Sequence, residues 1–425
     1  MKPMKLQYLL ATILTILGLT VVAQSPVPVD TLAFVRYEND TLAFDPATSS
    51  LPAFFQKMDE VIATGRGNVS IMHIGGSHVQ AGTMSHRIRR NLLNDFPDRI
   101  ARRGMIFPYS VAPKCNNPAD YRVSKNVTFS LIRNVYKDID RPLGVTGIAV
   151  YTSDTTAEIK IRLNTPDLSF PTSRIILLGY PDSTWALDYD VRVVPSLVIG
   201  EDEYFPSEID TNTRRYIYDV PTMSDSFLLK INNYDNTTFT LTGILLDDDA
   251  PGLTFHSIGV NGAQVSSYLK CKNFEEDLQL IRPDLVIFGI GINDAAAAGF
   301  DTVAFKNNYL ELVRRIRTVS PDCAFIFLTN NDSYKKVKKK YSVNHNGELA
   351  RDVFYRLAAE TGGAVWDQFD IMGGLRSMDK WRIAGYAQYD RVHFTVKGYN
   401  LIGDLFYNAF VDAWEKCRIS INNQD

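Results

Sequence analysis

The sequence predicts an α/β fold, a doubly wound parallel sheet of five strands, with an inserted all-β sandwich or jelly roll. Two observations carry this prediction. Five short, continuously apolar runs alternate with segments whose apolar residues recur at helical spacing, a pattern typical of strands buried on both faces of a parallel sheet. Between the first two runs, a long stretch of short alternating segments divided by turn residues is typical of antiparallel sheets.

The elements of the parallel layer follow one another along the chain. A helix is expected at 51–65, where the apolar spacing is helical and a glycine ends it. The predicted strands are 68–76, 253–260, 284–291, 324–329 and 363–367. The other predicted helices are 83–93, 263–281, 304–320, 347–362 and 395–414. In such a sheet, ligands bind outside the carboxyl ends of the strands.

The alternating stretch interrupts this layer. It is rich in Thr, Val, Tyr, Ile, Asp, Asn and Pro, and segments such as "TAEIKIRLN" and "TFTLTGILL" alternate apolar with polar residues. We therefore expect a discontinuous α/β domain formed by 24–109 and 250–425, and a β-rich domain formed by 110–249.

The N-terminus has the layout of a secretory signal. "MKPMK" carries two lysines, an apolar run follows, and "VVAQ" offers small residues for cleavage after Ala23. This predicts a signal peptide at 1–23 and an exported mature chain without a stable membrane span. The apolar run is nearly long enough to span a bilayer, which leaves an uncleaved anchor as the alternative.

Charge and cysteine content exclude some classes of function. A net charge of −3 at pH 7 over 425 residues provides no field that would recruit nucleic acid. The four cysteines form no CxxC pair and no cluster of zinc spacing, so no metal and no cofactor is expected. The sequence is equally compatible with two disulfides and with four buried free thiols. The cysteines concerned are Cys115, Cys271, Cys323 and Cys417.

Polar residues suited to one reaction occur at strand ends and before the last helix. Ser77 follows the first predicted strand, Gly262 the second and Asn293 the third, and "DRVH" places Asp390 and His393 before the last helix. The alternative role of Ser77 is that of a helix N-cap, which would not require a histidine or an aspartate nearby. Together these residues suit acyl transfer to a serine.

Each residue has a role in that chemistry. His393 can remove the proton of the Ser77 hydroxyl near neutral pH, and Asp390 can accept from the other imidazole nitrogen and fix the tautomer. The oxyanion of the tetrahedral intermediate needs donors, which the N–H groups of Ser77 and Gly262 and the side-chain amide of Asn293 could supply.

The blocks "GGSH", "GVNGA", "GIND" and "DRVH" resemble those of the SGNH (GDSL-type) hydrolases, over 68–105 and 253–413. The resemblance implies the flavodoxin-like sheet of that family and the same catalytic residues. One position departs from it, because Gly76 stands where the family has Asp, which affects how rigidly the serine turn is held. Val79 breaks the Gly-x-Ser-x-Gly pattern of the ordinary α/β-hydrolase elbow.

Within this family, "GGSHVQAG" and a β-rich insertion after the first block resemble the peptidoglycan O-acetylesterase group. This implies an O-acetylated polysaccharide or peptidoglycan as substrate, a carbohydrate-binding role for the insertion, and a periplasmic or extracellular location in a bacterium. His78 and Gln80 are candidate substrate contacts, each with a structural role as the alternative. Two other functions fit the same residues: an acetyltransferase with the same triad, and a non-catalytic glycan-binding protein on a hydrolase scaffold.

Further residues have simpler expected roles. The lysine run "YKKVKKKY" at 334–341 is expected to be a solvated loop, with contact to an anionic glycan as the alternative. Asp294 is expected to cap the segment that follows it, and His73 to lie in the core or at its rim. Trp366 and Trp381 could stack on a sugar ring or pack in the core.

Overall fold

The computed structural model describes residues 26–96, 100–113, 115–163, 172–182, 193–223, 226–233, 237–248, 250–338 and 340–422. The predicted signal peptide at 1–23 lies outside these ranges. Among the helices that the structure describes, none combines the length and the apolar composition needed to cross a bilayer.

All five predicted strands of the parallel sheet are present. They are β2 (Asn68–Gly75), β16 (Gly252–Gly259), β17 (Leu285–Gly289), β18 (Ala324–Leu328) and β21 (Ala364–Trp366). The complete sheet has the order β1-β21-β18-β17-β2-β16-β3. The edge strands β1 (Leu42–Ala43), antiparallel to β21, and β3 (Ile100–Arg102), parallel to β16, were not predicted. They are too short to show a periodic pattern.

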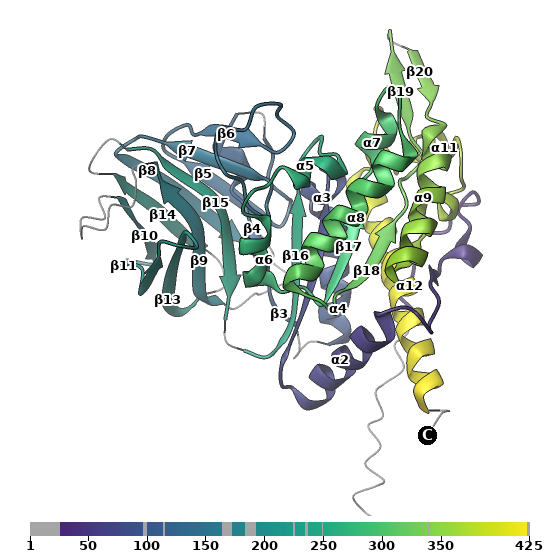
Figure 1. The fold of residues 1–425 in the computed structure, drawn as a ribbon, viewed down its shortest axis with the longest axis horizontal. Helices are drawn as coiled ribbons and strands as arrows, with labels where there is room; N and C mark the ends of the chain where they lie inside the picture. Colours follow the sequence, from purple (N-terminus) through teal and green to yellow (C-terminus); the bar gives the residue numbers. More distant parts are fainter. Residues whose placement is uncertain are drawn as a thin grey trace, which may run out of the picture.

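Helices cover both faces of this sheet, as a doubly wound fold requires (Figure 1). Alternate strand residues point to opposite faces. Ile71 of β2 packs in the cluster that includes helices α2 (Leu51–Thr64), α4 (Thr83–Asp95) and α12 (Val396–Asn422). Met72, the next residue, packs in the cluster of α8 (Thr302–Val319) and α9 (Asn346–Thr361). The shorter helices are α3 (Ser77–Gln80), α7 (Ile292–Ala296), α10 (Gln368–Ile371), α11 (Ser377–Ile383) and the 3-10 turns η1 (Tyr37–Asn39) and η2 (Tyr109–Val111).

The single helix predicted over 263–281 is wrong. The segment forms two helices, α5 (Val265–Leu269) and α6 (Phe274–Ile281). Between them, the N–H of Asn273 donates to the carbonyl of Leu143 at 3.0 Å instead of to a carbonyl of its own segment. A contact with a distant part of the chain thus overrides the helical pattern, which sequence periodicity does not register.

The β-rich segment forms two antiparallel sheets with the orders β11-β10-β14-β8-β5 and β12-β13-β9-β15-β7-β6, and β4 (Gly104–Ile106) also pairs with β15. The strands are β5 (Tyr121–Lys125), β6 (Ser130–Arg133), β7 (Ile148–Thr152), β8 (Thr156–Leu163), β9 (Thr172–Pro181), β10 (Val193–Ile199), β11 (Asp202–Tyr204), β12 (Glu208–Asp210), β13 (Arg215–Met223), β14 (Ser226–Asn233) and β15 (Phe239–Asp247).

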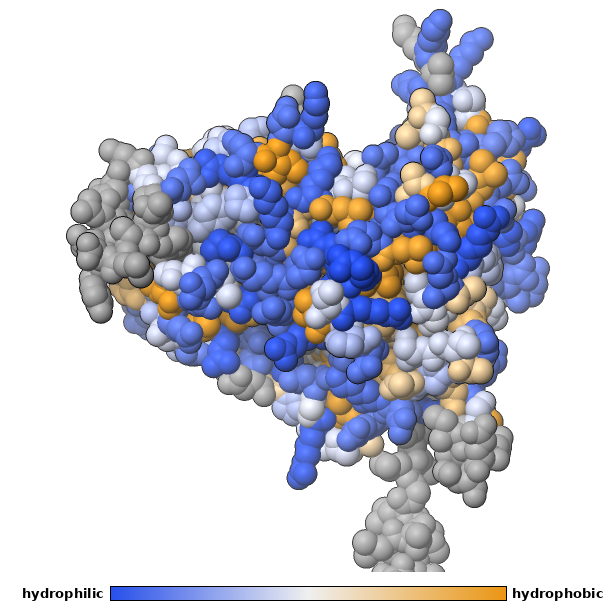
Figure 2. All heavy atoms as spheres, in the orientation of Figure 1, coloured by the Kyte–Doolittle hydropathy of each residue, from blue (hydrophilic) through white to orange (hydrophobic). Residues whose placement is uncertain are grey.

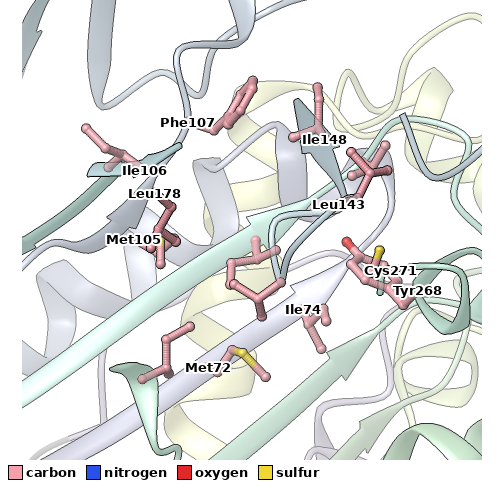
Figure 3. Packing of buried hydrophobic residues seen from close by; sticks show 14 of the residues in the cluster. Met72, Ile74, Met105, Ile106, Phe107, Leu143, Ile148, Leu178, Tyr268 and Cys271 are labelled. Atoms are coloured by element: carbon pink, nitrogen blue, oxygen red, sulfur yellow. The ribbon is translucent and has the colours of Figure 1, made fainter. Parts of the chain in front are cut away.

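One hydrophobic cluster joins the β-rich segment to the parallel sheet. Figure 3 shows Met72 and Ile74 of β2 close to Met105 of β4, Leu178 of β9 and Ile148 of β7. Among the described residues, this core does not divide at either end of 110–249. The division of the chain into two domains stays a prediction.

The lysine run is not a loop, contrary to the prediction. It forms the hairpin β19 (Tyr334–Val337) and β20 (Lys340–Val343), with Val337 opposite Lys340. Tyrosine and valine favour strands, and the five lysines of the sequence pattern hid that preference.

The four cysteines are buried free thiols, the second of the two alternatives. Burial raises the pKa of the Cys271 thiol to about 12, so this thiol stays protonated and unreactive at physiological pH.

Candidate active site

Ser77 lies where β2 passes into α3, at the edge formed by the carboxyl ends of the parallel strands. Two glycines, Gly75 and Gly76, precede Ser77, and the space around them requires a glycine only at position 75. A Cβ at Gly75 would lie 2.4 Å from the carbonyl oxygen of Gly289, whereas a Cβ at Gly76 would lie 3.4 Å from the Asn293 amide nitrogen, an ordinary contact. The φ of Gly76 is −96°, outside the left-handed region that favours glycine.

The structure brings Ser77, His393 and Asp390 together. The Ser77 hydroxyl oxygen lies 2.7 Å from His393 Nε2, and His393 Nδ1 lies 2.7 Å from Asp390 Oδ2. With the imidazole proton on Nδ1, facing the carboxylate, Nε2 is free to accept the proton of the Ser77 hydroxyl.

Asp390 is held as a carboxylate. Partial burial alone would raise its pKa, but hydrogen bonds from the His393 ring and from the backbone N–H groups of His393 and Val392 outweigh burial and lower the pKa to about 2. The two backbone bonds measure 3.0 and 2.9 Å. Asp390 therefore keeps its charge, and its hold on the imidazole, at all physiological pH values.

The turn that carries Asp390 and His393 is fixed from outside. Arg391 adopts φ 57°, a left-handed conformation that is unusual for a residue with a side chain. Its carbonyl accepts from the N–H of Tyr334 at 3.1 Å, and the carbonyl of Val392 accepts from the Asn331 side chain at 3.0 Å. The segment that leads into hairpin β19–β20 thus holds the turn, a connection that the sequence did not reveal.

Gly262 and Asn293 lie on the loops next to Ser77. The N–H of Val260 donates to the carbonyl of Gly75 at 3.2 Å, which anchors the first of these loops to the end of β2. Gly262 is exposed and adopts φ 83°. Asn293 donates one amide N–H to the carbonyl of Ala263 at 3.0 Å, which orients the amide and leaves its second N–H for another acceptor.

Gln80 is a brace between loops. Its side-chain oxygen accepts from the N–H of Asn261 at 2.7 Å, and its nitrogen donates to the carbonyl of Asn116 at 3.0 Å. The side chain is buried. Of its two predicted roles, the structure shows the loop-bracing one, and it links the Gly262 loop to the start of the β-rich segment.

His78 lies behind His393. The two rings have centroids 5.0 Å apart, and His78 Nδ1 lies 2.9 Å from the Tyr399 hydroxyl. Burial, with the nearby His393, lowers the pKa of His78 to about 3, so this ring is neutral. The geometry gives His78 a packing position against the base. Tyr399, at the start of α12, was missed because nothing in its sequence surroundings distinguishes it.

Three other expectations have clear outcomes. Asp294 caps α5, which precedes it in the chain, and not the segment that follows: its carboxylate accepts from the N–H of Val265 at 3.3 and 3.2 Å. His73 is buried and lies within hydrogen-bond distance of Ser85, so the core interpretation is confirmed.

Trp366 and Trp381 are fully buried and pack in the core, so neither is available to stack on a sugar. Among the residues described, no group of three or more His, Cys, Asp or Glu could hold a metal ion.

Residues 233–401 match the model of the GDSL-like Lipase/Acylhydrolase family. The match covers less than half of the 425 residues, and it shows that this part of the chain resembles that family. The predicted family resemblance is thereby confirmed, and with it the class of enzyme, a carboxylic ester hydrolase. The matched range contains Gly262, Asn293, Asp390 and His393, whereas Ser77 lies before it.

One solved structure resembles this chain in fold, and others match a smaller part of it. A peptidoglycan O-acetylesterase matches with a TM-score of 0.69 and 19% identity, over 88% of this chain and 99% of that one. An acetyl xylan esterase matches with a TM-score of 0.30 and 18% identity, over 38% of this chain and 82% of that one. A GDSL-like lipase from Bacteroides thetaiotaomicron matches with a TM-score of 0.30 and 17% identity, over 37% and 76%. No curated protein matches the chain.

Proposed function

We propose that this chain is an exported bacterial serine esterase that removes O-acetyl groups from a carbohydrate polymer, either peptidoglycan or another polysaccharide. One observation carries the proposal: the continuous relay in which the Ser77 hydroxyl lies 2.7 Å from His393 Nε2, and His393 Nδ1 lies 2.7 Å from Asp390. Few arrangements other than an activated nucleophile use a serine in this way.

In the proposed first half-reaction, Ser77 Oγ attacks the carbonyl carbon of the acetyl ester while its proton passes to His393 Nε2. Asp390 stabilises the imidazolium that forms. The N–H groups of Ser77 and Gly262 and the Asn293 amide donate to the oxyanion. The intermediate collapses when the bond to the sugar oxygen breaks and His393 returns the proton to that oxygen. The sugar hydroxyl is then free and Ser77 carries the acetyl group.

In the second half-reaction, water attacks the acetyl group on Ser77. His393 takes a proton from this water, a second tetrahedral intermediate forms in the same oxyanion site, and its collapse releases acetate. His393 finally returns the proton to Ser77 Oγ. The deacylating nucleophile decides the class of product, because a sugar hydroxyl in place of water would give an acetyltransferase.

The carbohydrate substrate and the location rest on separate support. The structural match to a peptidoglycan O-acetylesterase spans 88% of this chain, and it therefore includes more than the matched range of the family model. That protein is named for acetylated peptidoglycan, which favours an acetylated glycan here. The N-terminal pattern of 1–23 supports export, which would bring the enzyme to such polymers.

The test is release of free acetate from O-acetylated peptidoglycan and from a panel of O-acetylated polysaccharides. We expect release by the wild type, loss of release in Ser77→Ala, and wild-type release by Ser153→Ala, a matched change at an exposed serine outside the site. A folded Ser77→Ala variant that keeps most of its activity would overturn the proposal. Acetylated acceptor sugar in place of free acetate would assign a transferase instead.

A further inference from the structure

Hairpin β19–β20 has two different faces. Because side chains alternate along a strand, Tyr334 and Lys336 share one face with their cross-strand partners Val343 and Tyr341. We call Tyr334–Val343 the lysine hairpin. Its aromatic residues all lie on this one face.

The aromatic face is docked on the turn that carries the proposed base. The guanidinium of Arg391 lies 5.2 Å from the ring centroid of Tyr334 and 4.4 Å from that of Tyr341. Arg391 also pairs with Asp379 at 3.0 Å. Since Arg391 directly follows Asp390 in the chain, the lysine hairpin is fixed in position relative to Asp390 and His393.

The outer part of the lysine hairpin carries exposed positive charge, of which Lys336 Nζ lies 5.7 Å from the ring centroid of Tyr341. Lys336, Lys338 and Lys340 are exposed. Within the part of the chain that the structure describes, none of the three forms an ion pair with a carboxylate. The whole chain is slightly acidic, with 48 acidic and 45 basic residues, so this concentration of lysine is a local feature. Exposed positive charge gathered on one hairpin favours an anionic partner.

The lysine hairpin projects on the side of the molecule where the candidate site lies. In Figure 1 it rises beyond β17 and β18, and α3, whose first residue is Ser77, lies in this view between the hairpin and β6 of the β-rich segment. Figure 2 shows hydrophilic side chains along the hairpin and a hollow in the outline between it and the β-rich segment. In this view the lysine hairpin and α3 therefore lie toward the same edge of the parallel sheet.

We propose that the lysine hairpin binds carboxylate groups of the polysaccharide substrate and positions the chain across Ser77. The inference rests on the proposed function, since the ligand of the lysine hairpin is the acetylated polymer that the enzyme hydrolyses. Lysine side chains suit this role because they are flexible point charges that bind spaced carboxylates without a fixed geometry. The enzyme would thus prefer acidic O-acetylated glycans over neutral ones.

The test compares the wild type with a variant that carries Lys336→Gln, Lys338→Gln and Lys340→Gln. A control variant carries Lys57→Gln, Lys272→Gln and Lys416→Gln, the same loss of charge at exposed positions elsewhere. Acetate release is measured on a carboxylate-bearing O-acetylated polysaccharide, on neutral acetylated xylan and on 4-nitrophenyl acetate, at low and at high salt.

We expect the hairpin variant to lose ~10-fold in kcat/KM on the acidic polymer at low salt, through KM, because long-range attraction is lost. The loss should shrink at about 1 M salt, where the screening length falls to roughly 3 Å. Activity on xylan and on 4-nitrophenyl acetate should not change, and the control should match the wild type. Equal kcat/KM of hairpin variant and wild type on the acidic polymer would overturn the inference.

A binding measurement separates this inference from the proposed function. Affinity of Ser77→Ala, with and without the three lysine changes, is measured for the acidic polysaccharide and for a DNA duplex. Lysine-dependent binding of the polysaccharide without hydrolysis by the wild type would uphold the hairpin contact and defeat the esterase proposal. Equal lysine-dependent binding of the DNA duplex would overturn the assignment to a glycan and show a surface for polyanions in general.

Discussion

At the scale of single residues, the site depends on groups whose orientation is fixed by neighbours that do no chemistry. Asp390 receives two backbone N–H bonds, and Asn293 is tied to the carbonyl of Ala263. Such fixed dipoles need no reorganisation when charge develops on the substrate, which is how oxyanion donors lower a barrier.

Asn293→Ala should lower kcat by ~100- to 1,000-fold, the usual effect of removing one oxyanion donor, with KM nearly unchanged. The reason is that the donor acts where charge develops and contributes little to binding of the uncleaved ester. Steady-state kinetics on a small acetyl ester provide the measurement. A parallel fall in binding and turnover would make Asn293 a binding residue.

The two glycines before Ser77 should respond differently to alanine. Gly75→Ala places a methyl group 2.4 Å from the carbonyl of Gly289, a clash with backbone that should cost roughly 1–3 kcal/mol of stability or more. Gly76→Ala meets only an ordinary contact and should be nearly neutral. The melting temperatures of the two variants and the wild type provide the measurement, and each variant serves as the control for the other. Equal destabilisation would contradict the described turn.

Asp277 is a buried acid whose effect on the pH dependence of stability can be measured with a single substitution. Burial raises its pKa to about 7, against ~3.9 for aspartate in an unfolded chain, so the folded state binds the extra proton between these values. The contribution of Asp277 to the free energy of unfolding is therefore fully present below about pH 4, and it is lost as the pH rises toward 7. Its carboxylate accepts from the N–H of Val145 at 3.1 Å, a bond that an asparagine oxygen can keep.

Asp277→Asn should thus gain stability relative to the wild type between pH 5 and pH 8, on the order of 2 kcal/mol. Denaturant unfolding at both pH values measures the difference between variant and wild type. The comparison is necessary because buried His73 and His256, whose pKa values burial lowers to about 3, favour folding at higher pH and oppose the trend in the wild type. A difference that does not change with pH would contradict the assignment.

At the scale of elements, the sequence predicted what has a regular period and missed what depends on distant contacts. The apolar runs of β2 and β17 were recognised because both faces of each strand are buried. The break between α5 and α6 was missed because the carbonyl of Leu143 replaces a helical partner. The lysine hairpin was missed because its five lysines hid the strand preference of Tyr and Val, and because Arg391, which contacts Tyr341, lies far along the chain.

The site could be predicted to a similar extent. Each of Ser77, Asn293 and His393 is next to a strand end or helix start that periodicity locates, so their meeting follows from the topology of the sheet. The contact of His78 with Tyr399 could not be predicted, since it depends on how α12 packs beside α3. Gln80 had two open roles for the same reason, because its partner Asn116 lies in the β-rich segment.

At the scale of the whole molecule, the β-rich segment and the α/β layer share one core. β15 is buried along nearly its whole length, because it pairs with β9, β7 and β4 while its faces are covered. Figure 3 shows Met72 of β2 and Leu178 of β9 in the same buried cluster, on the two sides of this boundary. The segment is therefore part of the support of the site, in addition to any contact that it makes with a polymer.

Excision of 110–249 with a short linker should accordingly abolish cooperative folding, because it would expose the apolar face of β2 that holds Met72 and Ile74. Circular dichroism and a thermal melt of the truncated chain provide the measurement. A soluble truncated protein with a cooperative melt and full activity on a small acetyl ester would show instead that the α/β layer is a domain that folds independently.

The central claim, that Ser77 carries the acetyl group during turnover, can be tested directly by rapid acid quench of the reaction with an activated acetyl ester, followed by mass spectrometry of the digested protein. The account predicts a single acetyl group on the peptide that contains Ser77 in the wild type, with a burst of released alcohol that matches the amount of acetylated enzyme. Neither the burst nor the acetylated peptide should occur in Ser77→Ala, and both should occur in Ser153→Ala. Turnover without acetylation of Ser77, or acetylation of another residue with the same burst, would contradict it.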